Sequence, residues 1–171
     1  MRAKTPPVKL ICGLIFKDEK ILQRTKTLLV KKFGTIDLES QIIDFNYTDY
    51  YENEFGSGLK RQFISFKKLI SPEKLAQIKT QTNTLEKALA RDKHRRINID
   101  PGYVDMAKLV LATTKDYMHR IYLGKGIFAE ITLSYRGKSF QHWAWTYPDY
   151  QTPQYKKIFD QVRSIYAQQL K

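Results

Sequence analysis

Residues 119–145 read HRIYLGKGIFAEITLSYRGKSFQHWAW, and this stretch decides the fold class. From Ile127 to Ser134, apolar side chains alternate with polar or aromatic ones, which is the period-two pattern of a β-strand with two different faces. Residues 118–123 precede it as a second strand, and Gly124-Lys125-Gly126 has the length and the closing glycine of a common hairpin connection. The stretch therefore predicts an antiparallel sheet in the C-terminal half.

The register of this hairpin follows from matching the two strand faces. The pairs that do so are Leu123 with Ile127, Tyr122 with Phe128, and Arg120 with Glu130. They place apolar opposite apolar and a cation opposite a carboxylate, whereas a slip of one residue would oppose apolar and polar faces.

A third strand is expected after the turn Arg136-Gly137. Its register pairs Thr132 with Gln141, Glu130 with Trp143, and Phe128 with Trp145. Both tryptophans then share one sheet face with Arg120, Tyr122, Glu130 and Thr132. Two interpretations of this polar-aromatic face stay open. In the first, helices cover the face and Arg120–Glu130 is a buried ion pair. In the second, the face is open to a ligand, since aromatic rings and arginine are the groups that hold nucleic-acid bases.

The first hundred residues alternate in the order β-α-β-β-α-β. The expected strands are 8–16, 36–45, 61–69 and 96–99, and the expected helices are 18–33 and 71–90. This order is that of the ferredoxin-like class. The sequence therefore predicts one α+β domain, 1–171, with three parts. They are a basic arm (1–7), a ferredoxin-like β-α-β-β-α-β portion (8–100), and an antiparallel β-meander with a C-terminal helix (101–171) that Thr152-Pro153 opens.

Charge is the strongest compositional signal. Thirty Lys and Arg against seventeen Asp and Glu give a net charge of +13, which favours an anionic partner such as a nucleotide, a phosphorylated metabolite, a nucleic acid or an acidic protein surface. The single cysteine, Cys12, excludes a disulfide within the chain and a cysteine-rich zinc site. The longest apolar run, 8–16, is far shorter than the roughly 20 residues of a membrane span. We therefore expect a basic cytoplasmic protein without a membrane segment.

Polar side chains gather in three further segments. Residues 44–52 hold three carboxylates and three tyrosines, which could orient a hydroxyl or hold Mg²⁺ through several waters, although Asp and Asn also suit turns. Asp100 ends a predicted strand at the turn signal Pro101-Gly102. The stretch 108–120 could form a cationic wall for a phosphate, and His119 is either a satisfied core histidine or an acid or base in a pocket.

These segments give the candidate site. The catalytic candidates are His119, Glu130 and Asp100. The ligand-binding candidates are Arg120, Tyr122, Lys108, Lys115, Thr132, Trp143, Trp145, Asp49, Tyr50, Tyr51 and Glu52. No histidine spacing resembles a zinc site, so no metal ligands are assigned, and Mg²⁺ stays open as a cofactor.

Four motifs carry a family resemblance. They are Phe45-Asn46-Tyr47-Thr48-Asp49-Tyr50-Tyr51, Ile97-Asn98-Ile99-Asp100-Pro101-Gly102-Tyr103, His119-Arg120-Ile121-Tyr122-Leu123 and Trp145-Thr146-Tyr147-Pro148-Asp149-Tyr150. Over nearly the whole chain the sequence resembles the prokaryotic domain-of-unknown-function family 4416. Members of that family are sometimes labelled GTP-binding proteins, but this sequence has neither a P-loop nor the guanine-reading Asn-Lys-x-Asp. The resemblance therefore implies a family and no activity.

Three functions remain open at this level. The first is the binding of an anionic ligand, a nucleotide or a phosphorylated metabolite, in a polar-aromatic cleft on the sheet. The second is an enzyme acting on a phosphorylated small molecule or nucleic acid, with or without Mg²⁺. The third is a module for RNA or single-stranded DNA, or an adaptor for an acidic protein. Convergence of the motifs on one cleft would favour the first two.

Overall fold

The computed structural model describes residues 5–171, apart from the side chains of Asp49, Glu52 and Asn53. The chain is α+β. The strands are β1 (Lys9–Phe16), β2 (Ile36–Glu39), β3 (Ile43–Asp44), β4 (Lys60–Phe66), β5 (Ile97–Val104), β6 (Lys108–Thr113), β7 (Arg120–Gly124), β8 (Ile127–Arg136) and β9 (Ser139–His142). The helices are α1 (Glu19–Phe33), the four-residue α2 (Glu52–Phe55), α3 (Leu75–Leu89) and α4 (Pro153–Gln169).

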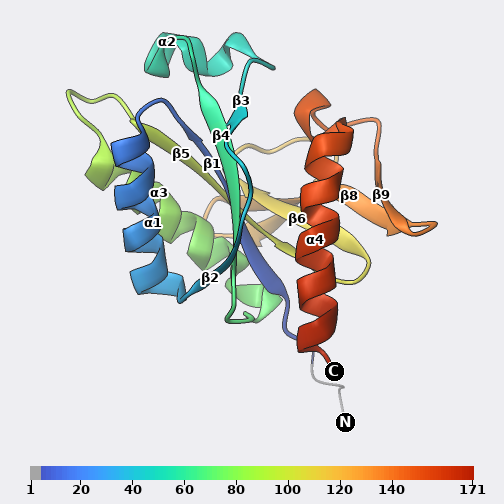
Figure 1. Ribbon diagram of the computed structural model, residues 1–171. Coiled ribbons are helices and arrows are strands. Elements are labelled where there is room, and N and C mark those ends of the chain that lie inside the picture. Colours follow the sequence, from blue (N-terminus) through green and yellow to red (C-terminus); the bar gives the residue numbers. More distant parts are fainter. Residues whose placement is uncertain (1–4) are drawn as a thin grey trace.

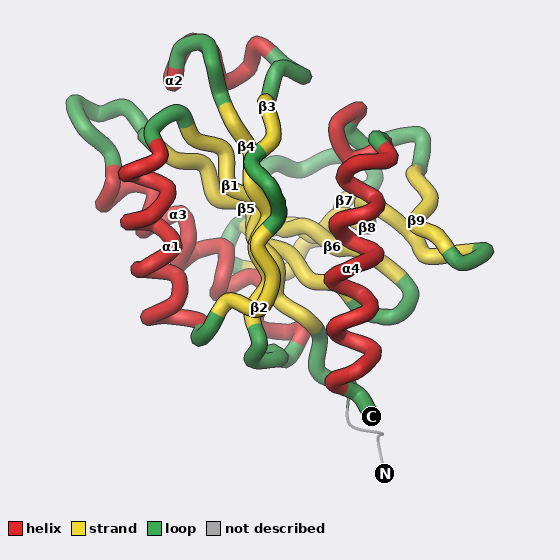
Figure 2. The backbone as a smooth tube through the Cα atoms, viewed as in Figure 1, coloured by secondary structure: helices red, strands yellow, loops and turns green. Residues whose placement is uncertain are grey.

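All nine strands join one antiparallel sheet. Its order is β2-β4-β1-β5-β6-β8-β7, with β3 paired to β4 and β9 paired to β8. Helices α1 and α3 lie on one side of the sheet and α4 lies on the other (Figure 1). In the tube view, β6 and β8 pass behind α4 (Figure 2).

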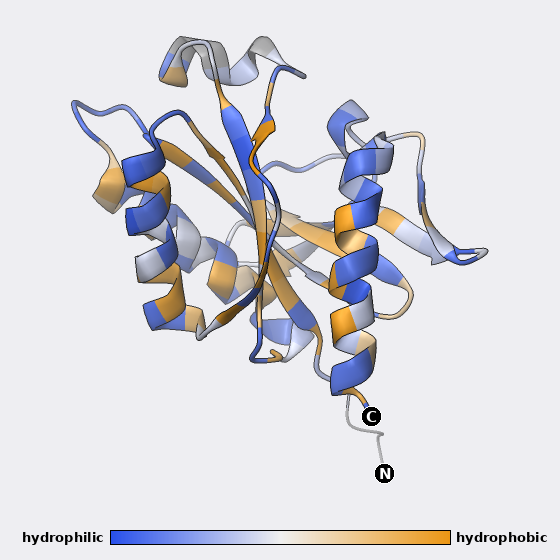
Figure 3. Ribbon diagram, viewed as in Figure 1, coloured by the Kyte–Doolittle hydropathy of each residue, from blue (hydrophilic) through white to orange (hydrophobic). Residues whose placement is uncertain are grey.

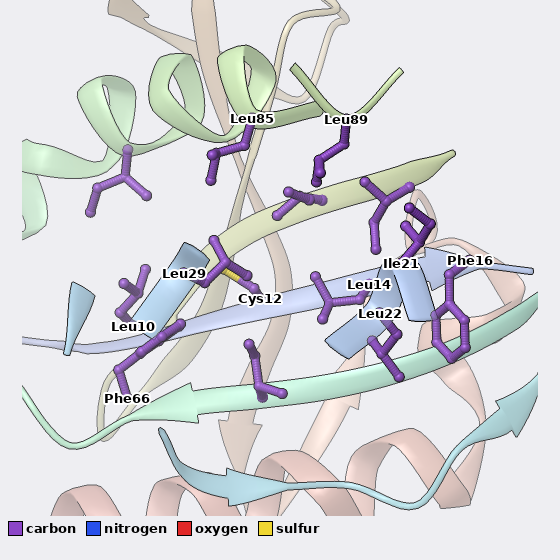
Figure 4. Close-up of a cluster of buried hydrophobic side chains, with 14 residues drawn as sticks. Leu10, Cys12, Leu14, Phe16, Ile21, Leu22, Leu29, Phe66, Leu85 and Leu89 are labelled. Atoms are coloured by element: carbon purple, nitrogen blue, oxygen red, sulfur yellow. The ribbon is translucent and has the colours of Figure 1, made fainter. Parts of the chain in front are cut away.

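The central strand β1 is buried along its whole length, because helices cover both of its faces. Leu10, Cys12 and Leu14 pack against α1 and α3 on one face (Figure 4). Ile11 joins the cluster beneath α4 on the other face. The hydropathy colouring shows the same division, with apolar residues along the central strands and polar residues on the outer surfaces of the helices (Figure 3). Burial on both faces explains why this strand appears in the sequence as a continuous apolar run.

Capping residues place the starts of α1 and α4 as the sequence predicts, whereas the helix predicted from residue 71 begins at Leu75. The Asp18 carboxylate accepts a hydrogen bond from the Lys20 N–H, and α1 ends at Gly34, whose φ of +95° an L side chain rarely adopts. At α4, the Thr152 hydroxyl accepts a hydrogen bond from the Tyr155 N–H. Ser71 precedes the short 3-10 helix before α3 and makes no such capping bond.

Replacing Thr152 with alanine should lower the free energy of unfolding by about 1 kcal/mol, because an N–H of the first turn of α4 loses its partner. Urea denaturation followed by circular dichroism measures this loss. Ser71→Ala is the matched control and should cost less. An equal cost for the two variants would contradict the capping role of Thr152.

Strand β5 corrects one prediction. Asp100-Pro101-Gly102 does not form a turn, because β5 continues through it to Val104. The ladder with β1, from Phe16 opposite Ile97 to Lys9 opposite Val104, holds this segment extended. A long antiparallel partner therefore overrides a local turn preference.

The first C-terminal hairpin has the predicted pairs Arg120–Glu130 and Tyr122–Phe128. The predicted pair of Leu123 with Ile127 is wrong. Gly124 pairs with Ile127 across a register shift, and the turn consists of two residues with φ of +57° and +72°, Lys125 and Gly126. Two left-handed residues form the tight turn that matches the twist of hairpin strands.

The predicted register of the second hairpin is also wrong. Gln141 pairs with Ser134, not with Thr132. The turn is Gly137-Lys138, with φ of +58° and +69°, and it lies one residue later than expected. A one-residue shift of a hairpin turn moves the pairing by two residues. Strand β9 therefore ends at His142, and the two tryptophans lie beyond it, not opposite Glu130 and Phe128.

Candidate ligand-binding pocket

The sheet opens between β5 and β6. The two strands pair only from Gly102 to Val104, so the β5 residues before Gly102 have no β6 neighbour. At this open edge, side chains of α3 make the hydrogen bonds to the backbone of Ile99 instead. Its N–H donates to Glu86 Oε1 at 2.6 Å, and its carbonyl accepts from Lys79 Nζ at 3.1 Å.

Pro101 explains why the strands separate there. Backbone groups two residues apart in a strand point the same way, so the nitrogen of Pro101 points toward β6 like the N–H of Ile99. Proline has no N–H to donate to a ladder. Pairing with β6 therefore stops beside this residue.

A cavity of about 480 Å³ occupies the opening. Its lining residues form five groups. Helix α3 contributes Lys79, Asn83, Glu86 and Lys87, and strand β4 with residues 95–100 contributes Arg61, Arg95, Asn98 and Asp100. The other groups are residues 111–115 of β6 and the following loop, Arg120 and Glu130 of the β7–β8 hairpin, and a mainly aromatic group from two loops (Phe45, Thr48, Tyr50, Tyr51, Tyr147, Tyr150).

Arg61 forms the centre of a buried ion cluster at this pocket. Its guanidinium donates to Asp149 Oδ2 at 3.1 Å and to Asp100 Oδ2 at 3.3 Å. Four aromatic rings surround it, from Phe45, Phe63, Tyr150 and Tyr155. Burial raises the pKa of Asp149, and the charge of Arg61 opposes that rise. The cluster fixes Asp100 with its carboxylate at the pocket.

Arg95 organises a second cluster. It donates two side-chain bonds to Glu54, at 2.8 and 2.7 Å, and one each to Glu86 and Asn98. The bond from Arg95 lowers the pKa of Glu54, whereas burial raises the pKa of Glu86. The carboxylates and cations on this wall are thus largely matched with one another.

Glu130 lines the opposite wall and is buried. Its Oε1 lies 2.8 Å from His119 Nε2 and accepts from Arg120 Nε at 3.3 Å, while Oε2 accepts from the Thr132 hydroxyl at 3.0 Å. The side chains of His119 and Thr132 do not line the pocket. They hold the Glu130 carboxylate from behind.

The two tryptophans form a stacked column with His119. The rings of Trp143 and Trp145 lie 5.1 Å apart at 9°, and Trp145 stacks on His119 at 5.2 Å and 15°. Arg136 lies over Trp143, 5.1 Å from the ring centroid. Each indole is thus already stacked on another ring, and Trp145 keeps 37% of its surface exposed.

The structure brings six of the candidate residues to the pocket. These are Asp100, Glu130, Arg120, Lys115, Tyr50 and Tyr51. The remaining described candidates lie outside its lining: His119, Lys108, Tyr122, Thr132, Trp143 and Trp145. Lys108 bonds to Asp105, and Tyr122 is exposed beside Phe128. The side chains of Asp49 and Glu52 are outside the described residues.

Sequence reasoning missed the contribution of α3 and β4. On α3, Lys79, Asn83 and Glu86 recur at intervals of four and three, which puts them on one helical face. A polar helix face usually faces solvent, so this spacing alone indicates no site. On β4, Arg61 shares a strand face with the apolar Phe63. A cation at a position where the core is expected was the one local sign in the sequence of a buried charge.

No group of three or more His, Cys, Asp or Glu side chains that could hold a metal occurs among the described residues. Most charged side chains that line the pocket are bonded to one another.

The fold and the pocket define an α+β protein with a charged pocket where an antiparallel sheet opens. The family model described as Domain of unknown function (DUF4416) matches residues 6–166, so the chain belongs to this family, as the motifs indicated. No curated protein and no solved structure matches the chain. Within residues 5–171, none of the helices has the length and apolar character needed to cross a membrane.

Proposed function

We propose that the pocket binds an anionic small molecule, a nucleotide or another phosphorylated metabolite. One observation carries this proposal. Six cationic side chains line one cavity, against three carboxylates (Glu86, Asp100 and Glu130): Arg61, Lys79, Lys87, Arg95, Lys115 and Arg120. The volume of about 480 Å³ lies within the range of roughly 300–1,000 Å³ typical of small-molecule sites.

The aromatic wall supports a nucleotide in particular. Tyr50 is exposed at the pocket, and its ring packs against Tyr51 at 5.0 Å. Lys115 lies over the Tyr50 ring, 4.0 Å from its centroid, and donates to its hydroxyl. Tyrosine rings can stack on the nucleoside of a nucleotide, and the neighbouring lysine can bind its phosphate.

Lys115→Ala should weaken nucleotide binding about tenfold, because a charge-assisted hydrogen bond to the phosphate is lost. Isothermal titration with adenosine and guanosine mono- and triphosphates, at low and moderate salt, measures this. Lys31→Ala is the control, since Lys31 is exposed on α1 and does not line the pocket. Equal affinities for both variants, or an affinity that salt leaves unchanged, would contradict the proposal.

Catalysis on the same phosphorylated ligand is a second candidate function. It is favoured by two carboxylates, Asp100 and Glu130, that line the same pocket, the latter bonded to His119. Phosphorus NMR of nucleotides incubated with the protein tests it. Turnover that Glu130→Gln abolishes would support catalysis, and unchanged nucleotides would leave binding as the function.

The order β2-β4-β1-β5, antiparallel throughout, with α1 and α3 on one side, supports placing residues 8–100 in the ferredoxin-like class. Unrelated functions occur on that fold. The functional proposal therefore rests on the pocket.

A further inference from the structure

The cations of the pocket fall into two sets. Arg61, Lys79, Arg95 and Arg120 each have a carboxylate oxygen within 4.0 Å, and Arg61 and Lys79 are buried. Their charge is matched by Asp100, Asp149, Glu86 and Glu130. A phosphate at this inner end would meet those carboxylates and gain little from cations that are already paired.

Lys87 and Lys115 form the other set. Both are exposed, and neither is paired with a carboxylate in the part of the chain whose side chains are described. On α3, burial decreases from Lys79 through Asn83 to Lys87, so this helix face runs from the interior of the pocket to its mouth. Unmatched positive charge is thus concentrated at the mouth.

The inner end offers hydrogen bonds in place of net charge. The Asp100 side chain is 25% exposed and presents an acceptor to the cavity. Tyr150 is buried, lines the cavity, and its hydroxyl has no hydrogen-bond partner among the described residues. Buried polar atoms are nearly always bonded, so this hydroxyl is left available as a partner for a ligand group.

We infer that the ligand is a phosphomonoester of a nucleoside or of another hydroxylated molecule, held in one orientation. Its phosphate lies at the mouth beside Lys87 and Lys115. Its uncharged portion lies inside, where Asp100 accepts from a hydroxyl or ring N–H and the Tyr150 hydroxyl makes a further bond. This inference rests on the proposed function of the pocket and specifies its substrate class.

Titration of three kinds of probe tests the orientation: inorganic phosphate, the four nucleoside 5′-monophosphates with ribose 5-phosphate, and the corresponding nucleosides with ribose. Tyr150→Phe should lower the affinity for the phosphomonoesters and for the uncharged probes by the same factor, about three- to tenfold, and leave the affinity for inorganic phosphate unchanged. The double variant Lys87→Ala/Lys115→Ala should lower the affinity for the phosphomonoesters and for phosphate and leave the affinity for the uncharged probes unchanged. Tyr150→Phe removes a hydroxyl without a protein partner, so the fold should be retained, which circular dichroism checks.

Two results would overturn the orientation alone. One is a loss of inorganic phosphate binding in Tyr150→Phe. The other is a gain in phosphomonoester affinity in Asp100→Asn, because the proposed orientation predicts a loss when the acceptor for the uncharged portion is removed. If the wild-type protein binds none of the probes, the proposed function itself fails, and the inference fails with it.

Discussion

Replacing Arg61 with methionine is expected to lower the free energy of unfolding by about 3–5 kcal/mol. The guanidinium is buried and bonds to both Asp149 and Asp100. Its removal leaves the buried Asp149 carboxylate without a counter-charge and takes one cationic partner from Asp100. An uncompensated buried charge costs far more than the loss of an exposed ion pair.

Guanidinium denaturation at constant ionic strength measures this loss. The control is Arg24→Met on the exposed surface of α1, which should change stability by less than about 0.5 kcal/mol. Adding Asp149→Asn to Arg61→Met should recover part of the stability, because one unpaired charge is removed. A double variant as unstable as the sum of the two single variants would contradict the charge explanation.

The stability lost in Arg61→Met should also become smaller as the pH is lowered. Burial already raises the pKa of Asp149, and loss of Arg61 removes the charge that opposes this rise. A carboxyl group whose pKa is higher in the folded than in the unfolded protein binds more protons when folded, so acid favours its folded state. The stability gap between variant and wild type should therefore narrow from about pH 7 to about pH 5.

Gly102→Ala is the second substitution with a large expected effect. A Cβ at Gly102 would lie under 3.0 Å from the Val110 carbonyl oxygen and from Leu111 Cδ2. The carbonyl oxygen belongs to the β6 backbone, which pairs with β5 at this point. We expect a loss of about 3 kcal/mol or more, with displacement of the β6 segment that lines the pocket.

Gly13→Ala on β1 is the matched control. There the nearest atom to the added Cβ is Phe63 Cε1 at 3.0 Å, part of a side chain that can move. Its cost should be about 1 kcal/mol. Thermal unfolding of both variants gives the comparison, and a smaller cost at Gly102 than at Gly13 would show that β6 is not fixed against β5.

Local features of this chain were predictable from the sequence because nearby atoms decide them. The capping side chains Asp18 and Thr152 bond to N–H groups two and three residues away. The pairing of Arg120 with Glu130 depends on a hairpin of a few residues and on alternation of faces. The second hairpin escaped prediction because two turns one residue apart fit the same pattern, and the left-handed backbone of Gly137-Lys138 decided between them.

The sequence by itself determined the α+β class, the apolar central strand, the capped starts of α1 and α4, two pairs of the first hairpin, and the net positive charge. Only the tertiary structure decided where the pocket lies. Arg61 bonds to Asp149, 88 positions away, and α3 bonds to the edge of β5 only because β6 separates at Pro101. Such contacts depend on how distant elements pack, and no short-range periodicity encodes them.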